Sequence, residues 1–214
     1  MKIQTIIRVV LVIGMFITGA ILYKYMPETV PTHWNYEGVV DGYSGKTFGT
    51  FMTPGIALLM LIFFPLLSKI DPKKENYESF KSTWAAIQTS LICVFAYIYA
   101  LQLYFTFTPE NSYMMGRMMV FGMGILFVFM GNLLGKVRQN YFIGIKTPWT
   151  LNDPEVWQKS QRFGGYMMVL GGIAFLIEAL IWQYLLAFLI IFITLVAIVP
   201  IVYSYVISRK KQAK

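Results

Sequence analysis

Few side chains in this sequence have the type and spacing that chemistry requires. His33 is the only histidine and Cys93 the only cysteine among the 214 residues. The chain has no H-E-x-x-H motif, no serine or cysteine paired with a histidine, and no pair of carboxylates within an apolar run. We therefore expect no catalytic residue and no enzymatic activity.

A metal site is also not expected. A lone histidine beside Trp34 is more often a hydrogen-bonded structural group than a ligand, because zinc takes three or four ligands. Metal binding at His33 is the alternative. Cys93 lies within an apolar run, and a single cysteine forms no intrachain disulfide. We expect neither a metal nor another cofactor.

Two ionisable residues, Arg117 and Glu178, lie within apolar runs at matched depths. Glu178 is about 18 Å along its run if a helix starts near residue 166, and Arg117 begins another run at a comparable depth. Because an unpaired acid in hydrocarbon is costly, we expect the two side chains to contact each other. The pair has two interpretations: a structural ion pair, or part of a polar site for a ligand arriving from outside.

The elements that position these residues must be membrane helices. The chain is 57% hydrophobic and only 13% charged, with a mean hydropathy of +0.60, which is more apolar surface than one soluble core can hide. The formal net charge is +8, but the cations flank apolar runs instead of forming one stripe with aromatic residues. The expected partner is therefore the lipid bilayer and not nucleic acid.

Six apolar runs have about the 20 residues that a spanning helix needs. They cover residues 6–25, 51–70, 84–106, 114–134, 166–182 and 185–208. The predicted fold is an all-α membrane protein with six transmembrane helices, a small extracellular β-like flap and a structured cytoplasmic loop. Its expected organisation is a two-helix region over residues 1–80 and a four-helix region over 81–214. A cleaved signal peptide is the alternative for the first run.

The distribution of cations predicts the orientation. With the N-terminus inside, only Lys24, Lys46 and Arg117 of the 18 lysines and arginines lie outside. Because cytoplasmic loops carry an excess of lysine and arginine, we expect both termini in the cytoplasm of a bacterial cell. The inner loop at residues 68–83 mixes charges and is expected to be a solvated connector.

The external segment, residues 26–50, is short and aromatic. Residues 30–35 and 39–43 are predicted to pair as two strands about a turn at Glu37-Gly38, with Pro27 and Pro31 confining them to an edge. The aromatic residues of this flap are also typical of interface anchors.

The internal segment, residues 131–165, is the longest polar interval and is dense in aromatic residues, glycine and proline. Asp153 followed by Pro154 predicts a helix of about ten residues that presents Val156 and Trp157 to the lipid headgroups, after which Gly164-Gly165 turns the chain. Gly131 and Gly135 have a spacing that allows close helix contact. The alternative interpretation is that the segment merely folds onto the bilayer.

Two motifs carry a resemblance to a known family. They are P-T-H-W-N-x-x-G with D-G-Y-S-G-K, in residues 26–53, and G-N-x-x-x-K-V-R-Q-N-Y-F-I-G-I-K-T-P-W-T-L-x-x-x-x-V-W-x-K-x-x-R-F-G-G, in residues 131–165. Both resemble the SdpI family of bacterial immunity proteins. The family commonly has His where this chain has Gln161, which puts a role for a titrating group at that position in doubt.

The resemblance implies a six-helix membrane protein of Gram-positive bacteria that protects its producer from a secreted toxic peptide. The founding member of the family also sequesters a small autorepressor at the membrane once toxin is bound, which implies signalling through a cytoplasmic partner. A small-molecule or peptide transporter is the alternative function, although the chain has no evident inverted repeat.

The resemblance and the predicted topology together indicate candidate sites on both sides of the membrane. The toxin-binding candidates are Pro31, His33, Trp34, Asn35 and Gly38. The candidates for contact with a cytoplasmic partner are Asn132, Asn140, Gly144, Lys146, Thr147, Pro148, Trp149, Thr150, Trp157 and Arg162. Aromatic and arginine side chains usually carry the binding energy of such contacts, which singles out Trp149, Trp157 and Arg162.

Overall fold

The chain is described by a computed structural model that covers residues 2–35 and 39–213. Within them, six helical stretches are long and apolar enough to cross a membrane. These stretches are Lys2–Tyr25, Lys46–Ile70, Lys74–Phe107, Pro109–Leu134, Pro154–Ile181 and Leu185–Gln212. The predicted all-α membrane fold with six spans is confirmed.

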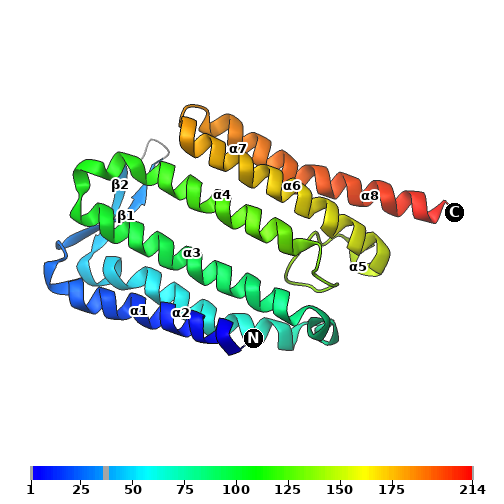
Figure 1. Cartoon of the computed structure of the whole chain (residues 1–214), viewed down its shortest axis with the longest axis horizontal. Helices are drawn as coiled ribbons and strands as arrows, with labels where there is room; N and C mark the ends of the chain where they lie inside the picture. Colours follow the sequence, from blue (N-terminus) through cyan, green and yellow to red (C-terminus); the bar gives the residue numbers. More distant parts are fainter. Residues whose placement is uncertain (1, 36–38, 214) are drawn as a thin grey trace. The chain divides into compact units, whose positions relative to one another are not determined.

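The elements follow one another as shown in Figure 1. They are α1 (Lys2–Leu22), η1 (Tyr23–Tyr25), β1 (Thr29–Trp34), β2 (Val40–Gly45), α2 (Lys46–Ile70), η2 (Lys74–Phe80), α3 (Lys81–Phe107), η3 (Pro109–Met114), α4 (Met115–Leu134), α5 (Pro148–Asn152), α6 (Pro154–Ile181), α7 (Leu185–Ile193), η4 (Thr194–Ile198) and α8 (Val199–Gln212). The η4 segment is a π-helical turn that ends two residues before Pro200. Proline has no backbone N–H and so cannot donate a helical hydrogen bond.

The predicted flap forms a two-stranded antiparallel sheet. Thr29 pairs with Gly45 and Trp34 pairs with Val40, with irregularities in the register on both sides of His33. The predicted turn at Glu37-Gly38, and with it the toxin-binding candidate Gly38, lies outside the described residues.

One predicted boundary is wrong. The structure has no turn at Gly164-Gly165, because α6 continues without a break from Pro154 to Ile181. The expected short helix and the expected fifth span are therefore a single helix. Glycine in this helix serves close packing instead, since the carbonyl oxygen of Gly131 lies 2.6 Å from where a Cβ on Gly165 would be.

Two compact units make up the chain, Met1–Phe64 with Gln88–Gly122, and Pro65–Ile87 with Met123–Lys214. The core of the first unit joins α1, α2, α3 and the hairpin. Val30 of β1 is fully buried in this core, where its side chain lies against Gly49 of α2 with no space for a Cβ. The hairpin is thereby anchored to the helices of its own unit.

The second unit is built on close helix contact between α4 and α6. Gly124 faces Gly172, and Gly131 faces Gly165, so a small residue recurs every seven positions on both helices. The rod formed by α7, η4 and α8 runs beside α6 (Figure 1). The side chains of α7 are not buried, with Leu186 at 73% and Ile190 at 58% exposure, as lipid-facing residues require.

Candidate functional site

The hairpin brings the toxin-binding candidates of β1 together on one short element. The side chain of His33 is 70% exposed, and its Nδ1 atom contacts the carboxylate of Asp41 on β2. Asn35 closes the described end of the hairpin, since its Oδ1 atom accepts a hydrogen bond from the backbone N–H of Val39 at 3.0 Å. His33 and Asp41 therefore form an exposed polar pair on the hairpin.

Trp34 has a different environment from His33. Its ring packs with the apolar cluster of Leu101, Phe105 and Met115, at the end of α3 and the start of α4. The indole Nε1 atom is buried and has no hydrogen-bond partner in the described part of the chain. Trp34 is thus partly an anchor of the hairpin and only partly available to a ligand.

A buried amide, Gln102 of α3, holds the base of the hairpin. Its Nε2 atom donates to the carbonyl oxygen of Pro31 at 3.3 Å and to that of Gly49 at 2.8 Å, while its Oε1 atom accepts from Thr53 at 3.2 Å. The residue is only 3% exposed. Pro31 therefore contributes its backbone to the positioning of the hairpin, and Gln102 is a site residue that the sequence analysis missed.

The internal segment is organised around Asn140. Its Nδ2 atom donates to the carbonyl oxygens of Arg138 and Ile143, at 2.8 and 3.0 Å. Its Oδ1 atom accepts from the backbone N–H groups of Phe142 and Ile143, at 2.9 and 2.7 Å. Asn140 is fully buried. Its Oδ1 atom also lies 3.5 Å from the Tyr77 hydroxyl of η2, which donates to it. These bonds, within the turn and to Tyr77, remove the Asn140 side chain from direct contact with a partner.

A second buried residue with several hydrogen bonds, Asp71, lies in the loop at residues 68–83, which was expected to be a solvated connector. That expectation is wrong, because Asp71 is 2% exposed and Tyr77 is 6% exposed. The Asp71 carboxylate accepts from the backbone N–H groups of Lys73 at 2.7 Å and Tyr141 at 2.8 Å, and from the Tyr77 hydroxyl at 2.9 Å. It therefore joins η2 to the internal segment.

The neighbours of Asp71 extend this connection. The Nζ atom of Lys73 donates to the side chain of Gln139 at 3.0 Å and to the carbonyl oxygen of Leu151 at 2.7 Å. Asn76 donates to the carbonyl oxygen of Gln139 at 2.8 Å. The sequence did hold a signal for this packing, since Tyr77, Phe80 and Trp84 recur at helical spacing. The ring of Tyr77 contacts the rings of both Phe80 and Trp84.

Gln161 occupies the position where the related family commonly has histidine. Its Oε1 atom accepts from the backbone N–H of Ile145 at 2.9 Å, and its Nε2 atom donates to the carbonyl oxygen of the same residue at 3.1 Å. Gly144 sits against this amide with φ +117°, in the region that favours glycine, and a Cβ there would lie 2.7 Å from Oε1 of Gln161. Gln161 is thus a fully buried brace for the turn.

The T-P-W-T motif forms a short capped helix, α5. The Thr147 side chain accepts from the backbone N–H of Thr150, and the Thr150 hydroxyl accepts from the backbone N–H of Thr147, which is a capping box. Pro148 occupies the first helical position. Both threonines are buried, so among these residues only Pro148 and Trp149 present surface to a partner.

Trp157 is placed differently from the expectation. Val156 and Trp157 do not face the headgroups, because they are only 3% and 1% exposed. The indole N–H of Trp157 donates to the carbonyl oxygen of Val137 at 2.8 Å, which draws the ring under the internal segment. The tertiary contact with Val137 decided the orientation of this helix face.

The remaining exposed candidates lie around these braces. Asn132 donates to the carbonyl oxygen of Val128, one helical turn earlier in α4. Lys146 donates to the carbonyl oxygens of Tyr141 and Phe142, each at 3.2 Å. Arg162 is exposed on α6, beside Gly135 of the internal segment. These three side chains are accessible to a partner.

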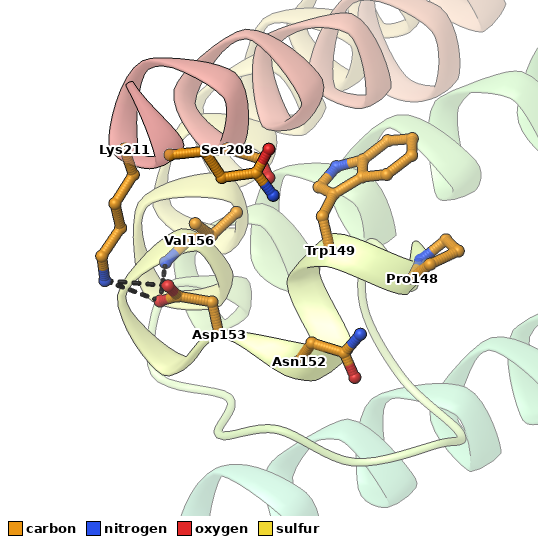
Figure 2. A pocket seen from close by; sticks show the side chains of 8 residues that line it. Pro148, Trp149, Asn152, Asp153, Val156, Ser208 and Lys211 are labelled. Carbon is orange, nitrogen blue, oxygen red and sulfur yellow. Dashed lines mark hydrogen bonds and ion pairs between the residues drawn. The ribbon is translucent and has the colours of Figure 1, made fainter. Parts of the chain in front are cut away.

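A groove lies between α5, the start of α6 and the end of α8 (Figure 2). Its volume is about 450 Å³, and it is lined by Pro148, Trp149, Asn152, Asp153, Val156, Ser208, Lys211 and Gln212. Trp149 is fixed on α8, since its indole N–H donates to Ser204 at 2.8 Å and its ring contacts Tyr205 edge-on. The groove thus combines an aromatic wall with charged groups.

Electrostatic contacts close one side of the groove. The Nζ atom of Lys211 lies 2.8 Å from a carboxylate oxygen of Asp153 and 2.8 Å from one of Glu155. The hydrogen bond from Lys211, followed by those from the backbone N–H groups of Val156 and Glu155, lowers the pKa of Asp153. Asp153 is also the N-cap of α6, as the sequence predicts. This charged contact connects α8 to the N-terminal end of α6.

Arg117 and Glu178 fall in different units of the structure. Glu178 is fully buried, and its Oε1 atom accepts from the backbone N–H of Tyr184 at 2.9 Å. This bond ties the end of α6 to the start of α7, at a turn where Trp182 adopts a left-handed conformation with φ 53°. Contact between Arg117 and Glu178 stays a prediction.

Comparison with known proteins identifies relatives of both motif regions. A family model described as the SdpI/YfhL protein family matches residues 136–204, and one described as a domain of unknown function (DUF1648) matches residues 10–58. The chain is 29% identical to Immunity protein SdpI of Bacillus subtilis (strain 168) over 212 residues, which is 97% of each chain. No solved structure matches significantly. The resemblance to the SdpI family is confirmed.

Proposed function

We propose that this SdpI-like membrane protein is an immunity protein that protects a bacterial cell from a secreted antimicrobial peptide. The observation that carries the proposal is the 29% identity to Immunity protein SdpI, which extends over 97% of both chains and so includes both motifs. The match to the SdpI/YfhL family model adds support over the braced internal segment and most of the helices that follow it.

The proposed topology has both termini and the internal segment in the cytoplasm, and the hairpin outside. The asymmetry of lysine and arginine supports it, since 15 of the 18 fall on the proposed inner side. A toxin that arrives from outside then meets the hairpin first. We assign the toxin contact to the hairpin candidates, Pro31, His33, Trp34, Asn35 and Gly38.

Their environments rank these hairpin candidates. His33 is the most accessible of the described ones, and its imidazole ring is positioned by the contact of Nδ1 with the Asp41 carboxylate. The ring of Trp34 is partly buried against the apolar cluster and partly exposed at the surface. Pro31 acts through the backbone contact with Gln102, which sets the position of the strand. His33 is therefore the residue to change first.

We further propose that the internal segment recruits a cytoplasmic partner, a repressor in the case of signalling. The accessible candidates support this role best, namely Lys146, Pro148, Trp149 and Arg162, together with the groove beside Trp149. The buried candidates Asn140, Thr147, Thr150 and Trp157 act by holding the segment in shape. Gly144 does so through its backbone conformation, with φ +117°. Asn132 lies at the edge of this surface.

Toxin challenge tests the proposed function. A Bacillus subtilis strain that lacks its own SdpI is co-cultured with its parent strain, with this protein or an empty vector expressed in the deletion strain. We expect the protein to raise survival, and His33→Ala to lower that protection at unchanged membrane abundance. Tyr43→Ala is the matched control, because Tyr43 is an exposed ring on the neighbouring strand outside the candidate set.

Partner recruitment is measured separately from survival. Trp149→Ala and Arg162→Ala should reduce co-purification of a cytoplasmic protein with the membrane fraction while protection persists, and Lys136→Ala removes an exposed cation of the same segment as a control. Equal survival with the protein and with the empty vector, at normal abundance, would refute the immunity function. Parallel loss of abundance in all variants would assign both segments to folding alone.

A further inference from the structure

Arg8 is a buried cation inside the first membrane helix. The buried face of α1 consists of Arg8, Val12, Met15 and Gly19, so position 8 faces the interior of the first unit and not the lipid. Arg8 is only 6% exposed. Burial of a charged group within a membrane span costs free energy. A long basic side chain can avoid that cost by reaching toward the interface instead of into the bundle. Its burial calls for a physical reason.

The immediate partners of Arg8 are polar but neutral. Its Nη1 atom donates to Oε1 of Gln88 on α3, and its Nη2 atom donates to the hydroxyl of Thr5 at 2.9 Å. Among the described residues of the first unit, no carboxylate oxygen lies within 4.0 Å of the guanidinium. The positive charge is therefore hydrogen-bonded without being neutralised by a carboxylate among the described residues of its own unit.

Unused polar atoms surround the same position. The Nε atom of Arg8 and the Oε1 atom of Gln4 are buried and have no hydrogen-bond partner within the described residues. Residues 4 and 8 are one helical turn apart and share a face. A guanidinium has five N–H donors in a planar fork that matches an oxyanion, and a buried charge is costly unless an opposite charge meets it. Of the two unpaired atoms, only Arg8 Nε is a donor; Gln4 Oε1 is an acceptor, so Gln4 can meet an anion only through its amide NH₂ group.

The depth of Arg8 indicates which anion is available. The span Lys2–Tyr25 has 24 residues, or about 36 Å of helix against about 30 Å of hydrocarbon. A span that is about 6 Å longer than the hydrocarbon extends about 3 Å beyond it at each end. Arg8 lies about 9 Å from the start of α1, which places it about 6 Å below the hydrocarbon boundary. Phosphate groups of the bilayer are concentrated just above that boundary, within reach of a small local displacement of a headgroup.

We propose that Arg8, with Thr5, Gln4 and Gln88, binds one phosphate-bearing anion at the end of α1. An anionic phospholipid headgroup or free phosphate would supply the same oxygens, which accept from the guanidinium fork, the Thr5 hydroxyl and the side-chain amides. The bound phosphate neutralises Arg8 and joins α1 to α3 through Gln88. The site is built from residues of α1 and α3 and uses no residue of the hairpin or of the internal segment.

The test uses the full-length protein in nanodiscs of phosphatidylcholine with or without phosphatidylglycerol. We expect phosphatidylglycerol to raise the thermal midpoint and native mass spectrometry to find it retained on the protein. Arg8→Gln should lose the shift and reduce retention about tenfold. Lys2→Gln is the matched control, since it removes an exposed cation from the same helix and should behave like the wild type.

A third arm separates the two sources of phosphate. Inorganic phosphate added to phosphatidylcholine nanodiscs should stabilise the wild type only if the site takes a free anion, whereas stabilisation by phosphatidylglycerol alone identifies the headgroup. Stabilisation by neither would overturn the proposal, and so would equal retention by wild type and Arg8→Gln. If Arg8→Gln fails to accumulate, Arg8→Lys replaces it, because lysine keeps the charge without the guanidinium fork. Arg8→Lys should retain about tenfold less lipid than the wild type. Equal retention of lipid by Arg8→Lys and the wild type would then overturn the proposal.

Discussion

Exchange of Asp71 for asparagine should destabilise the protein through a single buried atom. One carboxylate oxygen accepts from the Tyr77 hydroxyl and the Tyr141 N–H, and the other accepts from the Lys73 N–H at 2.7 Å. In the best orientation of Asp71→Asn, the amide oxygen keeps the first two bonds and the amide NH₂ group meets the Lys73 N–H. Two donors then face each other at a site that is 2% exposed.

The magnitude follows from these three contacts. The Lys73 N–H left without an acceptor costs about 1–3 kcal/mol, and each of the two remaining bonds loses about 1 kcal/mol on changing from a charged to a neutral acceptor. We therefore expect Asp71→Asn to lower the free energy of unfolding by about 3–5 kcal/mol. The loss should be concentrated in the contact of η2 with the internal segment.

Reversible unfolding in mixed micelles, followed by tryptophan fluorescence at neutral pH, measures this change. Trp84 is a suitable reporter, because its ring contacts Tyr77 edge-on at 5.2 Å. Glu75→Gln is the matched control, since Glu75 is an exposed acid in the same loop and should change stability little. If Asp71→Asn and Glu75→Gln both stay within about 0.5 kcal/mol of the wild type, the reasoning about Asp71 is refuted.

Three other predictions test sidedness, backbone strain and charge. Single cysteines at Ser44 and Asn152, in a Cys93→Ala background, should react with an impermeant thiol reagent in intact cells at position 44 only; the reverse pattern would overturn the topology. Gly144→Ala should cost about 1–3 kcal/mol, because φ is +117° and a side-chain oxygen lies 2.7 Å from the new Cβ; an unchanged melting curve would contradict this. The folded pKa of Asp153 is lowered by its hydrogen bond to a lysine, so its stabilisation is complete above the unfolded value of about 3.9 and is lost as pH falls through the lower folded value. Asp153→Asn should flatten the acid limb of stability against pH, and parallel curves would exclude the contribution.

Local chemistry explains what could be predicted from the sequence. Six runs of apolar residues define six spans, because each spanning helix must satisfy its own backbone within the membrane. The cap at Asp153-Pro154 and the pairing of the hairpin strands are equally local, since they depend on neighbouring residues and on alternation. These features were expected before the fold was known, and the structure has them.

Side-chain packing at a distance explains what the sequence left open. The direction of Trp157 depends on a carbonyl group 20 residues away, and the burial of Asp71 depends on a backbone N–H 70 residues away. Gly164-Gly165 has the composition of a turn, yet α6 continues through it. Both glycines serve close packing instead, Gly165 against Gly131 of α4 and Gly164 against Ile145 of the internal segment.

The division of the motif residues has the same origin. Asn140 and Trp149 look alike in sequence as polar or aromatic members of one motif. Only the tertiary structure decides that Asn140 is buried and hydrogen-bonded within the turn and to Tyr77, while Trp149 forms the wall of a groove. Sequence by itself determined how many helices enter the membrane and what chemistry lies between them. The fold decided which of those side chains remain free to bind, because burial and hydrogen bonding are set by residues far apart in the chain.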